Sequence, residues 1–400
     1  MKRAALRPAG RANADGGADV DNGSCALLSG QKRTAGQMWM WLLRPAGRVS
    51  NGKGTDMDKG DIRLKKVIVH ILDSTVGIPV LSDTLLDYGS DFGDFLRGHI
   101  CKIQSSDDKK ACEFYKDGSE VYQQLADFVE AGFSDDAFVE ASQKLASRLY
   151  GIMNKNIGIP QADFVEALFE VDAKDYLALL KMDYKASYTH QTQSDAFGNT
   201  NGIIKFGAIL PTETQKLSEA AIINLSDFTI SLTEKKYEVN GAKAYYFSKL
   251  FLCCSGALSP KSQLSIVTRA IDTVQKKYLN DGEQFEAQME AKQVIHNQLA
   301  ETGAVDVPFV LDKVFKEKEE CKEEVQEKLE KYKMGADARI EPQAESTTRR
   351  FGKQHLTTDT GVEIKIPMEQ YQDGEHIEFI TNPDGSISIL IKNVGHITSK

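Results

Sequence analysis

The amino-acid sequence predicts an α+β protein: an antiparallel sheet flanked by helices, with a helical region and a small C-terminal β-hairpin unit. Residues 163–171 and 176–185 each show side-chain patterning with a period of two, which is typical of half-buried strands. The short polar stretch between them suits a hairpin turn. Stretches with helical spacing lie on both sides of this pair, so we expect the hairpin mid-sheet with helices on its apolar face.

The segment before the hairpin should contain one strand and several helices. Residues 62–72 alternate early and then become continuously apolar, as expected of a strand, and His70 within it should be a core or edge histidine. The chain after Val80 is mostly helical in pattern, up to a break at residues 154–158. Ser119 and Ser134 each precede a stretch with apolar residues on one helical face, so we expect both to be helix N-caps.

Further strands and then helices are expected beyond the hairpin. The expected strands are residues 202–210, 220–225, 228–232 and 236–239. The expected helices are residues 244–252, 260–279, 283–300 and 307–332. A last hairpin, 376–381 with 386–391, surrounds an Asn-Pro-Asp-Gly turn. We therefore expect a main α+β domain over residues 57–334, and a linker with a small C-terminal β unit over residues 335–400.

Residues 1–56 differ from the rest of the chain. They lack any helical or strand period and carry nine Lys or Arg against four acidic residues. They are either a disordered basic arm that contacts DNA or a leader upstream of a true start at Met57. The second interpretation is favoured because ordered patterning begins abruptly at Asp61. We therefore expect a disordered leader, whose presence in the native protein an intact-mass measurement would settle.

The remaining residues are strongly acidic. They hold 40 basic and 54 acidic side chains, and the whole chain has a formal net charge of −9. Nucleic acid and bilayers repel such a body at long range, so binding to a polyanion requires a local basic surface. No run reaches the ~18 apolar residues of a membrane span. The six cysteines form no CxxC pair, and we expect a cytoplasmic protein with reduced thiols.

Two acid-free stretches are candidates for contact with nucleic acid. The first, residues 346–358, holds Arg349, Arg350 and Lys353, with Phe351 among them as an aromatic ring that could stack on an unpaired base. Lys and Arg are the side chains that neutralise phosphate groups. The alternative is an interdomain linker whose arginines pair with the acidic body.

The second acid-free stretch, residues 239–271, contributes Lys261 and Arg269. Its apolar content is high, so most of it should be core, and the functional alternative is a basic rim on that core. Neither stretch shows a helix-turn-helix, zinc-finger or RNP signature, so sequence-specific reading of bases is not expected.

Signatures of catalysis do not occur in the sequence. No HExxH, HxxxH or GxSxG is found, and a near match to a P-loop at residues 47–53 has Gly54 where Ser or Thr would hold magnesium. Four aspartates stand about one helical turn apart and could bind Mg²⁺, although such a row is more often the solvated face of a helix: Asp83, Asp87, Asp91 and Asp94. We predict no catalytic residue, no metal ligand and no cofactor.

Several stretches also form a recognisable set in their order and spacing. They are Lys66–Asp73 with Val80–Ser82, Asp175–His190, Ile209–Pro211, Gly241–Leu252 and Asn382–Ile389. Together they resemble the bacterial nucleoid-associated protein family of the NdpA/YejK type, over about residues 61–400. The resemblance implies a cytoplasmic protein that co-localises with the bacterial chromosome. It implies no enzymatic activity and no catalytic residues.

These observations predict a non-enzymatic nucleoid-associated protein. It would bind DNA weakly and non-specifically through a local patch, with RNA or single strands as further ligands, or join the nucleoid through protein partners. The second route follows from the acidic charge, because an acidic surface can compete with DNA on a basic partner. The rival hypothesis is a metal-dependent enzyme that processes nucleic acid. The sequence leaves open which nucleoid proteins are partners and whether the chain forms a homo-oligomer.

Overall fold

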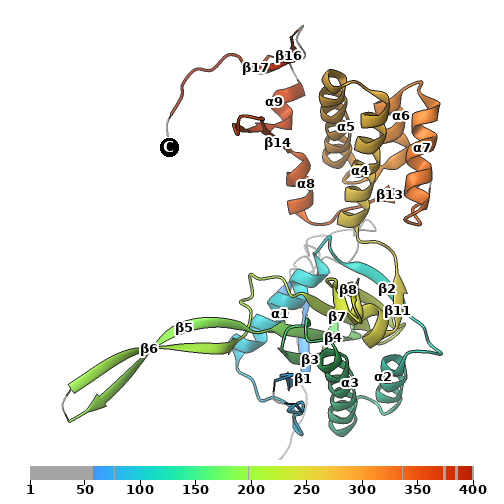
Figure 1. The fold of residues 1–400 in the computed structure, drawn as a ribbon. Coiled ribbons are helices and arrows are strands. Elements are labelled where there is room, and N and C mark those ends of the chain that lie inside the picture. Colours follow the sequence, from blue (N-terminus) through green and yellow to red (C-terminus); the bar gives the residue numbers. More distant parts are fainter. Residues whose placement is uncertain are drawn as a thin grey trace, which may run out of the picture. The chain divides into compact units, whose positions relative to one another are not determined.

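A seven-stranded antiparallel sheet organises the first part of the fold (Figure 1). The computed structural model describes residues 57–75, 77–196, 198–335, 337–372, 375–382 and 386–398, all within the unit Thr55–Lys400. The expected leader and the near P-loop lie outside these residues. In spatial order the strands are β1 (Arg63–Leu72), β3 (Ala162–Val171), β4 (Lys174–Asp183), β7 (Glu219–Asn224), β8 (Thr229–Thr233), β2 (Lys110–Phe114) and β11 (Cys254–Gly256).

The predicted hairpin is confirmed as β3 and β4. Its two-residue turn, Asp172 and Ala173, has φ values of 50° and 59°, as a type I′ turn requires. The hairpin lies inside the sheet, between β1 and β7. The expectation that it is half-buried is wrong, because helices cover both faces and even Glu166 and Lys181 are buried.

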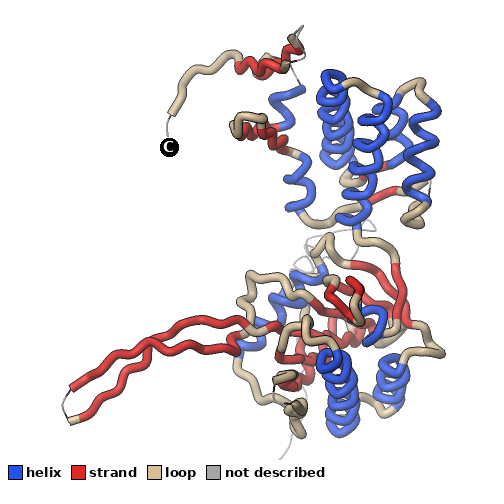
Figure 2. The backbone as a smooth tube through the Cα atoms, viewed as in Figure 1, coloured by secondary structure: helices blue, strands red, loops and turns tan. Residues whose placement is uncertain are grey.

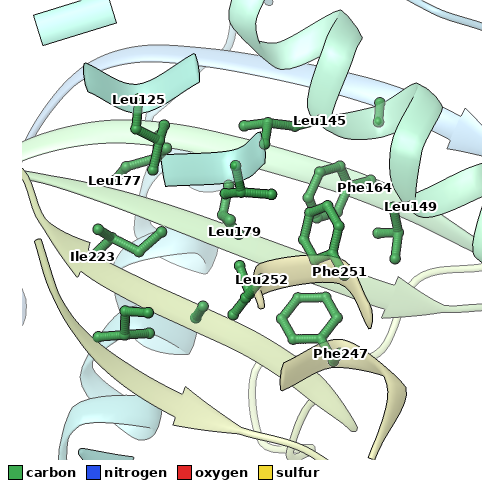
Figure 3. Close-up of a cluster of buried hydrophobic side chains, with 14 of the residues drawn as sticks. Leu125, Leu145, Leu149, Phe164, Leu177, Leu179, Ile223, Phe247, Phe251 and Leu252 are labelled. Carbon is green, nitrogen blue, oxygen red and sulfur yellow. The ribbon is translucent and has the colours of Figure 1, made fainter. Parts of the chain in front are cut away.

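The two faces of the sheet bury separate cores. On one face, α1 (Ser90–Gln104) packs Leu96 and Ile100 against Val165 and Leu180. On the other face lie α2 (Glu120–Glu130) and α3 (Asp135–Lys155). Figure 3 shows this second core, where Leu145 and Leu149 of α3 face Phe164 of β3 and Leu179 of β4. The apolar side chains on the two faces of the hairpin are therefore buried in two different cores.

The predicted helix caps are also confirmed. The Ser119 hydroxyl accepts a hydrogen bond from the backbone amide of Tyr122 at the start of α2. The Ser134 hydroxyl accepts one from the backbone amide of Ala137 at the start of α3. The zone expected to be mostly helical is so, as α1, α2 and α3, but it also contains β2, which was not predicted. The helix expected at 244–252 is present only as a short π-helical segment, η2 (Phe247–Leu252). It follows a small hairpin of β9 (Tyr237–Val239) and β10 (Ala242–Ala244).

Four helices build a third core, separate from the two cores of the sheet. They are α4 (Pro260–Tyr278), α5 (Asp281–Thr302), α6 (Val307–Phe315) and α7 (Glu319–Glu330). The single helix expected at 307–332 is broken at Lys316, whose φ is 50°. This core also takes in Ile340, whose strand β13 (Arg339–Ile340) pairs with β12 (Val305–Asp306), and Phe351 packs against it.

The C-terminal residues form short elements. They are α8 (Glu345–Phe351), β14 (Lys353–Thr357), β15 (Glu363–Pro367), α9 (Met368–Gln372), β16 (Ile377–Thr381) and β17 (Ile387–Ile391). The pairing of β16 with β17 confirms the predicted last hairpin, although residues 383–385 of its turn lie outside the described residues. Phe379 of β16 lies 4.9 Å from Phe285 of α5, measured between ring centroids.

One hairpin stands apart from the main sheet. β5 (Lys185–Asp195) and β6 (Gly198–Ile209) pair only with each other and extend away from the sheet as a two-stranded ribbon (Figure 2). The strand expected at 202–210 is confirmed as part of β6, whereas β5 was not predicted beyond its first residue, Lys185. Elsewhere, the five cysteines within the described ranges are free thiols. No helix in those ranges is long and apolar enough to cross a membrane.

Candidate nucleic-acid interface

A cavity of about 730 Å³ gathers basic side chains from distant parts of the chain. It is lined by α4, α5, α8 and β14, by the loop between α1 and β2, and by Lys216 of the loop before β7. Its six Lys and Arg residues are Lys216, Lys261, Arg269, Lys292, Arg350 and Lys353, and His355 lies beside them. Three aspartates line the same cavity: Asp107, Asp108 and Asp272. The lining therefore carries an excess of positive charge in a chain that is acidic overall.

Five of the six residues predicted from the sequence line this cavity. Lys261 and Arg269 come from one acid-free stretch, and Arg350, Phe351 and Lys353 come from the other. The fold thus brings the two stretches together. Phe351 is half-buried against the helical core, so only part of its ring faces the cavity.

Arg349 is the sixth predicted residue, and it does not line the cavity. Its Nη2 atom lies 2.6 Å from the Glu345 carboxylate, one helical turn earlier on α8, and its side chain is 73% exposed. Arg349 is therefore paired within α8 and not with the acidic body, and no ion pair is formed by Arg350 among the described residues.

The start of α4 fixes the position of Lys261. The Ser259 hydroxyl accepts from the Ser262 amide, and Pro260 occupies the first helical turn. This combination of a serine N-cap and an early proline is a strong helix start. Arg269 follows Lys261 by about two turns, so both side chains lie on the same face of α4. The local sequence therefore directs both cations toward one side of the helix.

Asp107 holds the start of α8 beside this face. α8 has no side chain of its own that caps its first turn, since its N-cap residue is Ala344. The buried Asp107 carboxylate accepts instead from the amides of Gln343, at 2.6 Å, and Ala344, at 3.0 Å. An anionic acceptor at a helix N-terminus is also favoured by the helix dipole. The charge of Asp107 is therefore used to position α8.

Asp108 joins two lysines of the cavity. Its Oδ1 lies 2.9 Å from Lys261 Nζ, and its Oδ2 lies 3.0 Å from Lys216 Nζ. Burial alone would raise the pKa of the Asp108 carboxyl, but the hydrogen bonds from Lys261 and Lys216 outweigh this effect and lower it. One ionised carboxylate thus pairs with two ammonium groups, so the three side chains together carry a net charge of +1.

Four further cations of the cavity have no such partner. Within the described ranges, no carboxylate oxygen lies within 4 Å of the charged groups of Arg269, Lys292, Arg350 or Lys353. Burial lowers the pKa of Lys292, nearby Asp272 opposes that shift, and the positive charge of Arg350 lowers it further. The positive charge of Arg350 therefore adds to the effect of burial in disfavouring the charged form of Lys292.

A second cavity of about 350 Å³ shares Asp108, Lys216 and Lys261 with the first. We call the two together the basic cleft. The second cavity adds four charged side chains: Lys102, Lys110, Lys235 and Glu234. Lys110 and Glu234 form an ion pair at 3.0 Å. Over both cavities, nine Lys or Arg side chains stand against four carboxylates.

The sequence analysis missed five of these nine cations. They are Lys102, Lys110, Lys216, Lys235 and Lys292. Each occurs in a stretch of mixed charge, so an acid-free window does not select it. No local pattern marks these residues, because only the tertiary fold brings them to one surface.

The aspartate row considered for magnesium does not form one helical face. Asp83 and Asp87 precede α1, whereas Asp91 and Asp94 lie on it. The Asp83 carboxylate accepts a hydrogen bond from the side-chain amide of Gln143, and Asp94 forms an ion pair with Arg97 at 2.8 Å. Among the residues that the structure describes, no group of three or more His, Cys, Asp or Glu side chains is arranged to hold a metal ion.

Comparison with known families decides the classification. The family model NA37, described as nucleoid-associated protein YejK, matches residues 68–397. The chain belongs to this family. The resemblance noted in the sequence is thereby confirmed, and the protein is of the nucleoid-associated class. No curated protein matches the chain.

Proposed function

We propose that this member of the YejK family binds nucleic acid directly, weakly and without sequence specificity, by placing phosphate groups in the basic cleft. The observation that carries the proposal is the set of four cleft cations without a carboxylate within 4 Å among the described residues: Arg269, Lys292, Arg350 and Lys353. A phosphate bound in the cavity beside Lys292 and Arg350 would offset the positive charge of both side chains. Binding that releases counterions from phosphates requires such unneutralised cations.

Other lining groups suit the same ligand. Ser346 and Thr347, which carry hydroxyl groups, line the cavity, and so does Thr268, whose hydroxyl donates a hydrogen bond to the Leu264 carbonyl within α4. Serine and threonine hydroxyls commonly donate to phosphate oxygens, and such contacts position a nucleic acid without reading its sequence. The cleft therefore supports phosphate binding on duplex DNA, RNA or single strands alike. The protein would act as a cytoplasmic component of the nucleoid, without catalysing a reaction.

A second route to the nucleoid is supported by an acidic groove of about 650 Å³ along α4, α5 and α6. Four glutamates line it: Glu283, Glu286, Glu290 and Glu317. Two lysines, Lys316 and Lys318, are also present, and Lys316 is paired with Glu290 at 3.1 Å. The remaining excess of carboxylates favours a basic protein partner, such as another nucleoid protein.

Equilibrium binding of the pure protein to a labelled DNA duplex, over a series of salt concentrations, separates these routes. Direct phosphate contact predicts that log K falls linearly with log salt, by about 0.9 per phosphate neutralised. Recruitment by a partner alone predicts no binding by the pure protein at any salt concentration. Loss of intact DNA only after Mg²⁺ or Mn²⁺ is added would favour the rival enzyme.

A further inference from the structure

The ribbon formed by β5 and β6 is exposed along its length. Its strands have 11 and 12 residues, and large apolar side chains near its base are open to solvent, with Tyr188 at 71% and Ile203 at 72% exposure. An isolated two-stranded hairpin gains little stability by itself in water, and its two free edges invite pairing. The ribbon contributes no buried side chain to the three hydrophobic cores, so its conformation would be stabilised by a binding partner.

The two halves of the ribbon differ in composition. The half near the sheet carries Lys185 and Lys205 together with the exposed apolar residues. The distal half, residues 191–194 and 199–202, contains only uncharged hydrogen-bonding side chains and one glycine. Over residues 185–209 there are two Lys and one Asp, so the ribbon is weakly basic within a chain of net charge −9.

The pairing register of β5 and β6 determines which of their side chains lie on the same face of the ribbon. Tyr188 lies opposite Lys205, and Thr192 lies opposite Asn201, so these four residues share one face. The other face carries Gln191 opposite Gly202. Each face of the distal half therefore presents an amide side chain, a group that can donate and accept hydrogen bonds at the edges of bases.

We propose that the ribbon enters the major groove of duplex DNA, with the distal amides at base edges and the proximal lysines at the bordering phosphates. The inference rests on the proposed function, since the cleft would hold the same duplex by its backbone. A two-stranded ribbon fits the major groove, which is about 12 Å wide and about 8.5 Å deep. At about 3.4 Å per residue, the four distal pairs extend for about 14 Å, which is more than enough to reach the floor of the groove.

The alternative occupant of the ribbon is a second copy of this chain. The core of a contact between copies is apolar, whereas the distal half of the ribbon has no large apolar side chain. The absence of acids from both strands up to Asp195 also favours a polyanion over the acidic surface of another copy. The charge of the strands and the composition of the distal half therefore favour DNA, and a second copy would contact only the proximal apolar side chains.

The test uses the full chain and a shortened ribbon. Residues 190–203 are replaced by Asn-Gly, which joins Thr189 to Ile204, two residues that face each other in the register, through a two-residue turn. Because the removed side chains whose burial the structure describes are all exposed, the thermal unfolding midpoint should not change. In the intact chain, bound duplex should be protected from dimethyl sulfate at guanine N7, which lies in the major groove.

The shortened variant should lose this protection and at least tenfold in duplex affinity, with single-strand affinity unchanged. As a second variant, Gln191→Ala/Asn201→Ala should weaken guanine protection without shortening the ribbon. Unchanged protection and affinity in the shortened variant would overturn the inference. So would a change from dimer to monomer with DNA affinity unchanged, which would assign the ribbon to contact between copies.

If the cleft does not bind phosphate, the variants give a different result. If the ribbon binds DNA but the cleft does not, Arg350→Ala/Lys353→Ala will bind duplex with the affinity and salt dependence of the intact chain, while the shortened variant will not. If the intact chain binds neither duplex nor single strands at low salt, both proposals are overturned.

Discussion

The Asp107 carboxylate accepts a hydrogen bond from the backbone amide of Ala344, a residue 237 positions later in the chain, at 3.0 Å. This contact fixes the first turn of α8, the helix that carries Arg350 toward the basic cleft. A residue of the loop between α1 and β2 thus determines where a C-terminal cation lies. The positive surface of the cleft depends on long-range contacts of this kind.

Removal of that contact should loosen α8. In Asp107→Ala the amides of Gln343 and Ala344 lose a charged acceptor, which should cost about 2 kcal/mol of local stability. Amide hydrogen exchange at these two residues should become faster. Asp107→Asn keeps an oxygen acceptor and should restore most of the protection. Equal exchange rates in the Ala variant and the wild-type protein would contradict this account of α8.

Asp108 should oppose DNA binding, because it neutralises one of the charges of Lys216 and Lys261. Asp108→Asn should therefore raise the affinity for duplex and steepen the salt slope by about one. The matched control is Asp312→Asn, which removes a carboxylate paired with Lys322 at 2.8 Å, away from the cleft lining. The interpretation fails if both variants change the slope equally, or if Asp108→Asn weakens binding.

Glu166 should destabilise the sheet as the pH rises. Burial raises the pKa of this carboxyl well above its ordinary value, and its Oε1 has no hydrogen-bond partner among the described residues. The folded state therefore retains a proton that the unfolded state releases above about pH 4.5, and stability falls as the pH increases. Glu166→Gln should raise the urea midpoint by more at pH 8 than at pH 5.

Glu170, on the same strand, gives the opposite control. Hydrogen bonds from Lys65, and then from Arg63, lower the pKa of its carboxyl. Its contribution is present above the ordinary pKa and lost in acid, so Glu170→Gln should slightly reduce stability at pH 8. An equal gain from Glu166→Gln at both pH values would show that ionisation of Glu166 does not oppose folding.

Local patterns predicted the elements of the fold whose determinants are local. The turn between β3 and β4, and the caps Ser119 and Ser134, need only residues that are close in sequence. The burial of Lys181 could not be predicted in this way. Its Nζ lies 3.3 Å from the Glu219 carboxylate on the neighbouring strand β7, and that partner is visible only once the sheet is assembled.

The candidate site was predictable to a similar extent. An acid-free window selected Arg350, Lys353, Lys261 and Arg269, because their sequence neighbours are also uncharged or basic. The same rule selected Arg349, which the α8 geometry pairs with Glu345, one turn away. It could not select Lys292, whose position beside Arg350 arises from the packing of α8 on α5.

The most direct test of the cleft compares neighbouring arginines in one assay. The salt slope of duplex binding is measured for the wild-type protein, for Arg350→Ala/Lys353→Ala, and for Arg349→Ala. Direct phosphate binding predicts a slope shallower by about 2 for the double variant, since each cation contributes about 0.9, and an unchanged slope for Arg349→Ala. A wild-type slope in the double variant, or an equal loss in Arg349→Ala, would contradict the central claim that the cleft binds phosphate.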